Sequence, residues 1–256
     1  MDELDTLASR VADLIIKAKR VVVFTGAGIS TESGIPDFRS PGGIWEQFDP
    51  DDFSYQKFVT DAASRRRLWQ LFRGLATTAE PNPAHYAIAE LYRLGKLDSL
   101  ITQNVDNLHQ RAGVPDDKVL ELHGNVQWLV CLGCRRRYPF EQVKARLDRG
   151  EEALDCEICH GILKPDAVLF GEPLPEKVLN EAISRSSRCD LFIVIGSTLV
   201  VYPAAYVPTY ALDSGAKLVI INLSATPLDG QAHVLVRAKA GEVMPRVILE
   251  VREKMG

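Results

Sequence analysis

Five short apolar runs constrain the fold of this chain more than any other feature of its sequence. The first is VVVF (21–24), and the others lie at 99–101, 119–122, 191–195 and 218–221. Hydrophobic residues at helical spacing fill the segments around them, at about 4–15, 82–95, 175–186, 203–213 and 242–253. Strands that alternate with helices indicate βα units. We therefore expect an α/β fold with a Rossmann-like, mostly parallel sheet.

The polar residues that follow these runs predict a single ligand-binding cleft. In open α/β sheets, ligands bind beyond the carboxyl ends of the strands. This chain places TGAGIS, TQNVD, HGN, GST and NLS there. Turn formation alone explains glycine, asparagine or serine at any one strand end. It explains less well four side chains that no turn requires, which are Gln103, Asn104, Asp106 and His123.

The loop after the first strand, GAGISTESGIPDFR (26–39), matches a dinucleotide-binding loop only in part. Gly26 and Gly28 fit the pattern G-x-G-x-x-G, but Thr31 stands where the third glycine belongs. That pattern is specific only when it is complete and a ribose-binding acid follows on the second strand. We find no convincing acid there, so a dehydrogenase rests on Gly-Ala-Gly alone.

Charge and hydropathy argue against two classes of partner. A net charge of −4 over 256 residues disfavours non-specific nucleic-acid binding, which needs many cations. We expect the basic runs 65–67 and 135–137 to be solvated faces. No apolar run approaches the ~20 residues of a membrane span, and the N-terminus lacks the basic head and apolar middle of a signal peptide. We expect a cytoplasmic protein with no membrane or direct nucleic-acid partner, and a monomer.

Two segments interrupt the alternation of strands and helices. Residues 42–81 are rich in aromatic side chains, and residues 126–165 hold four of the five cysteines. We expect both to be insertions that form a smaller domain over the cleft, one as a helical segment and the other as a zinc module. The main domain then comprises 1–41, 82–125 and 166–256.

The cysteines predict a structural zinc site. Cys131 and Cys134 form one C-x-x-C pair, Cys156 and Cys159 form another, and residues 135–155 separate them. Two such pairs at about this distance are typical of a tetrahedral Zn²⁺ site. Four thiolates leave no open position for water, so we expect the metal to be structural.

Other interpretations of the cysteines remain open at this point. The pairs could be redox dithiols or disulfides, although a cytosolic context disfavours disulfides. His160 is an alternative ligand, and Cys189 is expected to be a core thiol. A pure binding module would explain the cysteine pairs, but it leaves His123 and the polar strand ends unexplained.

Seven segments together resemble the sirtuin family of NAD-dependent protein lysine deacylases. They occur in the family's order and span nearly the whole chain, from about residue 12 to 250. The resemblance is greatest to the compact bacterial and archaeal members. The segments are GAGISTESGIPDFR, TQNVDNLHQRAG, ELHGN, the two C-x-x-C pairs, VLFGEPLP, GSTLVVYPA and LVIINLSATP.

The resemblance implies NAD as co-substrate and an acyl-lysine protein or peptide as partner. The acyl oxygen would attack the nicotinamide ribose, and His123 would act as general base, with Asn104 as the second catalytic residue. The products would be nicotinamide, free lysine and O-acyl-ADP-ribose. NAD would contact Gly26, Ala27, Gly28, Ser30, Asp37, Phe38, Arg39, Gln103, Asn104, Asp106, Gly196, Ser197, Thr198, Asn222, Leu223 and Ala240.

Within that set, Phe38 would cover the ribose and exclude water, whereas composition alone favours a core aromatic at this position. The substrate peptide would lie extended between VLFGE and VVYP, with the acyl group in an apolar tunnel. The residues implied for peptide and acyl binding are Val168, Phe170, Gly171, Glu172, Val200, Val201 and Tyr202.

The helical segment predicts which acyl groups fit. Family members that prefer succinyl or malonyl groups carry a Tyr-x-x-Arg pair, where this chain has Phe72 and Leu75. Burying the distal carboxylate without a partner would be costly, so we expect acetyl or longer neutral acyl groups. A mono-ADP-ribosyltransferase would use the same cleft, but the retained His123 and the VVYP segment argue against that as the main activity.

Overall fold

A six-stranded parallel sheet forms the larger part of the molecule, as the alternation of strands and helices predicts. The computed structural model describes residues 2–77, 79–151 and 154–256, and the side chains of 75–77 lie outside the description. Every neighbouring pair of strands in this sheet is parallel. In spatial order the strands are β3 (Val119–Glu121), β2 (Leu97–Thr102), β1 (Val21–Thr25), β7 (Leu191–Ile195), β8 (Lys217–Ile221) and β9 (Val234–Val236).

The strand order places the binding cleft. The chain winds outward from β1 in one direction through β2 and β3, and in the other direction through β7, β8 and β9. The order therefore reverses between β1 and β7, and ligands of such sheets bind at the carboxyl ends on either side of this switch point. β1 and β7 are buried at every position, which explains why both read as unbroken apolar runs.

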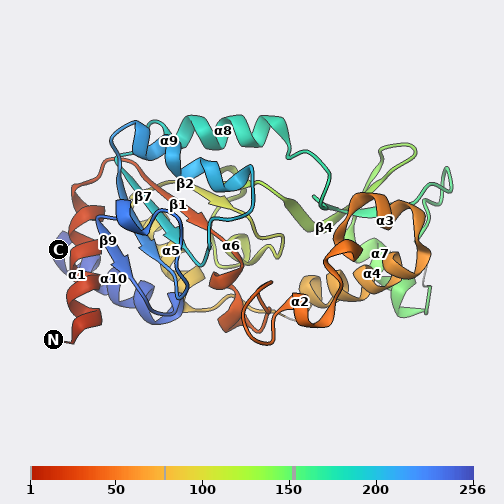
Figure 1. The fold of residues 1–256 in the computed structure, drawn as a ribbon, viewed down its shortest axis with the longest axis horizontal. Helices are drawn as coiled ribbons and strands as arrows, with labels where there is room; N and C mark the ends of the chain where they lie inside the picture. The colour runs from red at the N-terminus through yellow and green to blue at the C-terminus, as the bar shows by residue number, and fades with distance from the viewer. Residues whose placement is uncertain (1, 78, 152–153) are drawn as a thin grey trace.

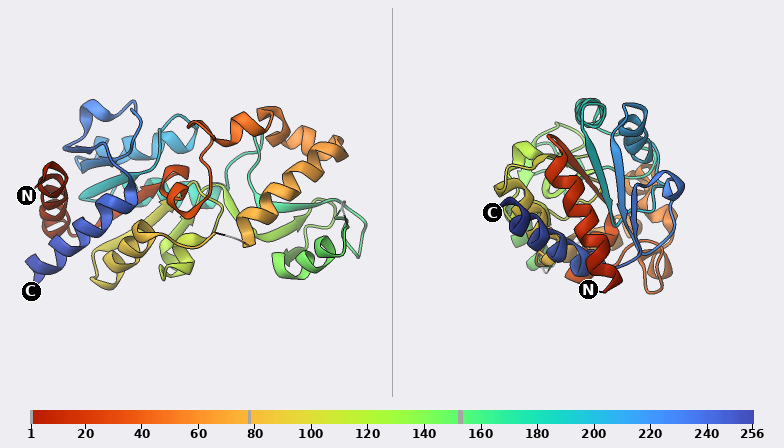
Figure 2. Two further views of the ribbon diagram at one scale, coloured as in Figure 1. Left: turned by 90° about the horizontal axis from the view of Figure 1, so that it is seen from below. Right: turned by 90° about the vertical axis from the view of Figure 1, so that its left-hand side faces the viewer.

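Helices cover both faces of the sheet (Figure 2). One face packs against α1 (Glu3–Lys17), α5 (Pro83–Arg93) and α10 (Ala240–Met255), and the other against α8 (Glu176–Ser186) and α9 (Val207–Asp213). The predicted start of α5 is confirmed, because the Asn82 side chain accepts a hydrogen bond from the Ala84 amide and Pro83 occupies the first turn. Shorter helices are η1 (Ala27–Ile29), η2 (Thr31–Ser33), α6 (Leu108–Arg111), η4 (Asp116–Lys118), η5 (Ala204–Tyr206) and η6 (Asp229–Gln231).

The smaller part lies at the end of the molecule opposite the two termini (Figure 1). It contains an antiparallel sheet in the order β5 (Arg137–Pro139), β4 (Gly124–Cys131), β6 (Leu163–Ala167), with α7 (Phe140–Asp148) beside it. The aromatic segment forms α2 (Ile44–Gln47), η3 (Pro50–Phe53), α3 (Tyr55–Thr60) and α4 (Ala62–Thr77). Among the described residues, no helix is long and apolar enough to cross a membrane.

Candidate active site

One cavity gathers every residue that the sequence implies for NAD, peptide and catalysis. Its volume is about 840 Å³, and it extends from the ends of β1, β2, β7 and β8 to the helical segment. The helical segment, expected over the cleft, supplies one wall of the cavity through Ile44, Trp45, Phe53, Leu71 and Phe72, of which only Phe72 was named from the sequence. The aromatic richness of residues 42–81 was the available signal, but only the tertiary fold shows which of these side chains reach the cavity.

Two loops that meet at the switch point require glycine. The Gly28 amide donates a hydrogen bond to the Gly196 carbonyl at 2.8 Å. A Cβ on Gly28 would lie 2.9 Å from the Gly196 Cα. Gly196 has φ of +65°, and a Cβ there would lie 2.2 Å from the Ile29 amide nitrogen. The two loops therefore pack backbone against backbone, and the glycines Gly26, Gly28 and Gly196 line this end of the cavity, which suits the close approach of a pyrophosphate.

Ser30 is the centre of a buried polar cluster behind the glycine loop. Its hydroxyl donates to Asp106 Oδ2 at 2.7 Å and accepts from Asn104 Nδ2 at 3.1 Å. The same Asn104 nitrogen lies 3.2 Å from the Gly26 carbonyl oxygen. Burial raises the pKa of Asp106, against the lowering effect of its hydrogen bonds from the Leu108 amide and Ser30. The cluster fixes the carboxamide of Asn104 at the floor of the cavity.

His123 is held in the tautomer that a general base requires. Its Nδ1 lies 2.8 Å from the backbone oxygen of Gln103. A carbonyl oxygen only accepts hydrogen bonds, so Nδ1 carries the proton and Nε2 carries the lone pair. Within the described chain, Nε2 has no hydrogen-bond partner. Burial lowers the pKa of His123, and the Gln103 carbonyl partly offsets this effect, so the ring is neutral near pH 7.

The Asp37 side chain holds the loop GIPDFR (34–39) in one conformation. Its carboxylate accepts hydrogen bonds from the amides of Arg39 and Ser40, at 2.9 and 2.7 Å, and from the Ser40 hydroxyl. Burial raises the pKa of Asp37, but these bonds outweigh it and hold the pKa below its usual value. The next residue, Phe38, lines the cavity and packs 5.0 Å from the Trp45 ring.

Four cysteines converge at the far end of the smaller sheet. Their sulfur atoms all lie within 4.8 Å of one another, and two of the separations are 3.4 Å (Cys131–Cys159) and 3.7 Å (Cys134–Cys156). Zn–S bonds of about 2.3 Å place tetrahedral sulfur ligands about 3.8 Å apart. The donor set and its spacing therefore fit a structural zinc ion.

The other two residues considered near the cysteines have different places. His160 lies outside the sulfur cluster. Cys189 is the expected core thiol, because it is buried against the larger sheet and donates a hydrogen bond to the Ser186 carbonyl at 3.1 Å. Burial raises the pKa of this thiol to about 12, so it stays protonated and unreactive.

Comparison with known proteins settles which family combines this cleft with this cysteine module. The sequence model of the Sir2 family matches residues 26–203. The chain belongs to the Sir2 family. A relative from Thermodesulfovibrio yellowstonii, named as an NAD-dependent protein deacetylase, is 46% identical over 94% of this chain and 93% of its own length.

Further relatives extend the match over both domains. A protein from Archaeoglobus fulgidus, named as NAD-dependent protein deacylase 2, is also 46% identical, over 95% of each chain. A solved complex of a Sir2 protein with a p53 peptide and NAD⁺ superposes with a TM-score of 0.86 at 40% identity, covering 96% of this chain and 98% of that one. The sirtuin resemblance and the expected fold class are therefore confirmed.

Two buried histidines, His85 and His109, lie behind the Ser30 cluster of this Sir2 protein, and His85 matches no catalytic motif. His85 Nδ1 accepts from the Asn82 amide, and its Nε2 lies 3.5 Å from the Ser30 hydroxyl. His109 Nε2 lies 2.9 Å from the Thr25 hydroxyl, and the two imidazole rings are 4.8 Å apart. Among the described residues, His109 Nδ1 has no partner.

The histidine pair makes folding stability depend on pH. Burial lowers the pKa of His85 to about 4 and the pKa of His109 well below its usual value. Below pH 6.5 both histidines become protonated in the unfolded chain but stay neutral in the folded chain. The free energy of unfolding therefore decreases as pH falls towards 4. We expect His85 alone to contribute a loss of about 2 kcal/mol between pH 7 and pH 5.

Urea unfolding of the wild type and the His85→Gln variant at pH 7 and pH 5 measures this contribution. The variant should lose less stability than the wild type over the same interval, because glutamine does not titrate. An equal loss in the two proteins would show that His85 is not responsible.

Proposed function

We propose that this chain uses NAD to remove acetyl or longer neutral acyl groups from protein lysines, giving nicotinamide and O-acyl-ADP-ribose. The observation that carries the proposal is the place of His123, whose Nδ1 is bonded to the Gln103 carbonyl and which lines a cavity with a glycine-lined end and an apolar end. The activities named for the close relatives support it. In the test, an acetyl-lysine peptide should lose its acetyl group only when NAD is present.

The glycine-lined end suits the dinucleotide. NAD supplies a ribose carbon that becomes electrophilic when nicotinamide departs. Gly26 and Gly28, which line this end of the cavity without a side chain in the way, accommodate the pyrophosphate. Gln103 and Ser197, joined by a 2.8 Å hydrogen bond from Gln103 Nε2 to Ser197 Oγ, link the loops after β2 and β7 and hold this end of the cleft in shape.

His123 performs the proton transfer. Its Nδ1–H is anchored on the Gln103 carbonyl, so Nε2 would take the proton of a ribose hydroxyl as that hydroxyl attacks the imidate carbon formed from the acyl group. A neutral imidazole suits this step because its unprotonated nitrogen can accept a proton. Asn104, fixed by Ser30 and Gly26, orients ribose and water.

The apolar end receives the acyl-lysine. Two segments that line the cavity, 168–172 and 200–202, expose the side chains of Phe170, Val200 and Tyr202. An extended peptide between them would pair through backbone hydrogen bonds, a mode that reads sequence weakly. Apolar side chains of Phe38, Trp45 and Phe53 and their neighbours exclude water from the reacting groups.

The same wall predicts the acyl preference. Arg73, the nearest cation in sequence to Phe72, pairs with Asp148 at 2.6 Å and is absent from the cavity lining. The side chain of Leu75 lies outside the described residues. A succinyl carboxylate buried against Phe72 would lack a cation, so kcat/KM for a succinyl-lysine peptide should be about 100-fold below that for the acetyl peptide.

Parallel assays of acetyl, butyryl and succinyl versions of one peptide test this preference. Introducing a cation by Phe72→Arg should reduce the difference in kcat/KM between the succinyl and acetyl peptides. Equal turnover of the acetyl and succinyl peptides by the wild type would contradict the assignment of this wall.

Three further points belong to the proposal. Residues 1–41, 82–125 and 166–256 act as the NAD-binding domain, with 42–81 and 126–165 as the smaller domain. The site functions in a monomer, since one chain supplies every residue implied for NAD, peptide and catalysis. The protein works in the cytoplasm, where a reducing environment keeps four neighbouring thiols available for zinc.

A further inference from the structure

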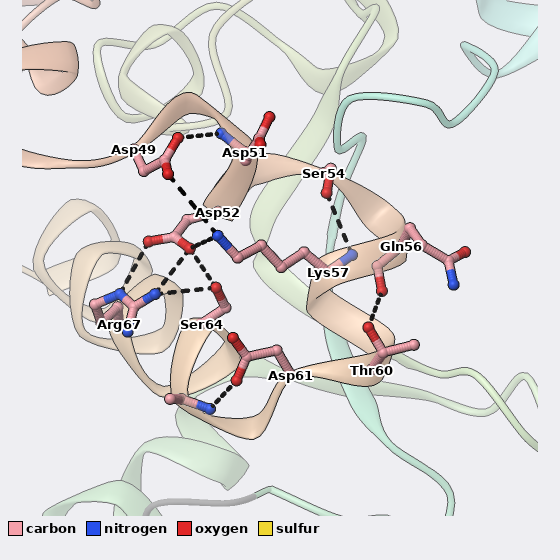
Figure 3. A network of polar contacts seen from close by, with 11 residues as sticks. Asp49, Asp51, Asp52, Ser54, Gln56, Lys57, Thr60, Asp61, Ser64 and Arg67 are labelled. Carbon is pink, nitrogen blue, oxygen red and sulfur yellow. Dashed lines mark hydrogen bonds and ion pairs between the residues drawn. The ribbon is translucent and has the colours of Figure 1, made fainter.

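A buried carboxylate ties together three elements of the helical segment (Figure 3). Asp52, at 3% exposure, lies on η3. It accepts two hydrogen bonds from Arg67 of α4, at 2.8 and 2.9 Å. It also forms an ion pair with Lys57 of α3 at 2.9 Å. The Ser64 hydroxyl of α4 donates to the same carboxylate. The expectation that the basic run 65–67 is only a solvated face is therefore wrong for Arg67, whose guanidinium pairs with a buried carboxylate.

The carboxylate needs all of these donors to remain buried. An ionised group loses its hydration on burial, and only close opposite charges and hydrogen bonds compensate. The Arg67 hydrogen bonds hold the pKa of Asp52 far below its usual range. Asp52 is therefore ionised at every pH where the protein works. The Asp52 carboxylate therefore fixes how η3, α3 and α4 pack together, because few other arrangements would supply all of its donors.

The same elements carry the apolar wall of the cavity. Phe53, the residue after Asp52, packs its ring 5.0 Å from Trp45. Its carbonyl accepts from the Phe170 amide, and the Tyr55 amide donates to the Phe170 carbonyl, both at 2.9 Å. One helical turn beyond Arg67, α4 places Leu71 and Phe72 in the cavity lining. Asp52 itself is not among the lining residues.

We propose that Asp52 and Arg67 are positioning residues that set the shape of the acyl-lysine channel from behind its wall. This inference rests on the proposed deacylase function. The carboxylate couples η3 to α4, so Phe53 and Phe72 keep a fixed separation. Through the backbone bonds of Phe53 and Tyr55, the same clamp fixes Phe170 on the peptide side. Weakening the clamp loosens peptide and acyl recognition and leaves the NAD end unchanged.

The variant Asp52→Asn keeps the shape of the side chain and removes its charge. We expect it to raise the peptide KM by about tenfold and to change the ratio of acetyl to butyryl turnover, because displacing channel walls degrades positioning. The KM for NAD should stay within about twofold. Fluorescence anisotropy of a labelled acetyl-lysine peptide, without NAD, should show the same loss of affinity independently of turnover.

A matched control lies in the same smaller domain. Asp148→Asn removes exposed ion pairs with Arg73 and Lys144, both at 2.6 Å, and touches no cavity residue. It should leave peptide KM, affinity and acyl ratio unchanged. If Asp52→Asn does not fold, Ser64→Ala and Arg67→Lys remove individual hydrogen bonds of the same clamp and should give intermediate increases in peptide KM.

The inference is overturned if folded, zinc-loaded variants of the clamp bind the peptide with wild-type affinity and keep the wild-type acyl ratio. Asp52 would then stabilise the fold only. Failure of the wild-type protein to deacetylate any peptide is a different result, since it removes the proposed function. The anisotropy comparison of wild type with Asp52→Asn would still decide whether the clamp shapes the channel.

Discussion

Replacing His123 with alanine should lower kcat for deacetylation by about 10²- to 10⁴-fold, the usual contribution of a positioned general base. The variant loses the imidazole that lines the cavity and is anchored through Nδ1 on the Gln103 carbonyl. Binding of NAD and peptide should change little, because neither the glycine loops nor the apolar wall depends on the imidazole. Calorimetry with NAD and single-turnover assays measure the two effects separately.

His233→Ala serves as the matched control for this prediction. His233 lies in the connection before β9 and bonds through its ring to the Leu218 amide at 3.2 Å, away from the cavity lining. We expect wild-type kcat from it. A His123→Ala variant with kcat within a few-fold of wild type would assign the proton transfer to another group.

Removing the zinc should unfold the smaller domain and abolish activity. Zinc binding to small Cys-rich modules contributes about 10–16 kcal/mol of apparent free energy near pH 7. Cys131 and Cys156 are both completely buried in the cluster that also contains Trp69 of α4, Leu129 and Phe140. Loss of the metal therefore removes support from α4 and from the acyl wall that α4 carries.

The variant Cys131→Ala and treatment of the wild type with a chelator should give the same result. We expect less than one zinc per chain by elemental analysis, a lower melting temperature and no detectable deacetylation. Cys189→Ala, at the buried thiol that packs against the larger sheet, should keep the metal and the activity. A zinc-free chain with an unchanged melting temperature would contradict the structural role of the metal.

The larger sheet was predictable because its central strands are buried on both faces. Burial on both faces makes β1 and β7 continuous apolar runs, which are visible in any sequence. β9 was missed because three residues carry too little pattern. β6 was missed because its sequence, LKPDA, does not read as a strand. It pairs with β4 beside the cysteine cluster, where metal ligation rather than strand propensity supports the local fold.

The cleft was predictable where its residues occupy short motifs at strand ends. All of the implied NAD and peptide residues line one cavity, because parallel strands bring their carboxyl ends to one edge of the sheet. Their individual roles stay predictions. Which aromatic side chains besides Phe72 form the wall, the His85–His109 contact and the Asp52–Arg67 clamp were not predictable. Each depends on contacts between segments whose sequence spacing carries no periodic signal.

The most direct test of the deacylase function follows the acyl group itself. An acetyl-lysine peptide carrying a deuterated acetyl group is incubated with the protein and NAD, and the products are identified by mass spectrometry. The predicted result is nicotinamide and an equal amount of O-acetyl-ADP-ribose that carries the deuterium, with free lysine in the peptide. Release of nicotinamide with the deuterated acetyl group still on lysine, and ADP-ribose attached to an arginine or free in solution, would contradict it and identify an ADP-ribosyl transfer instead.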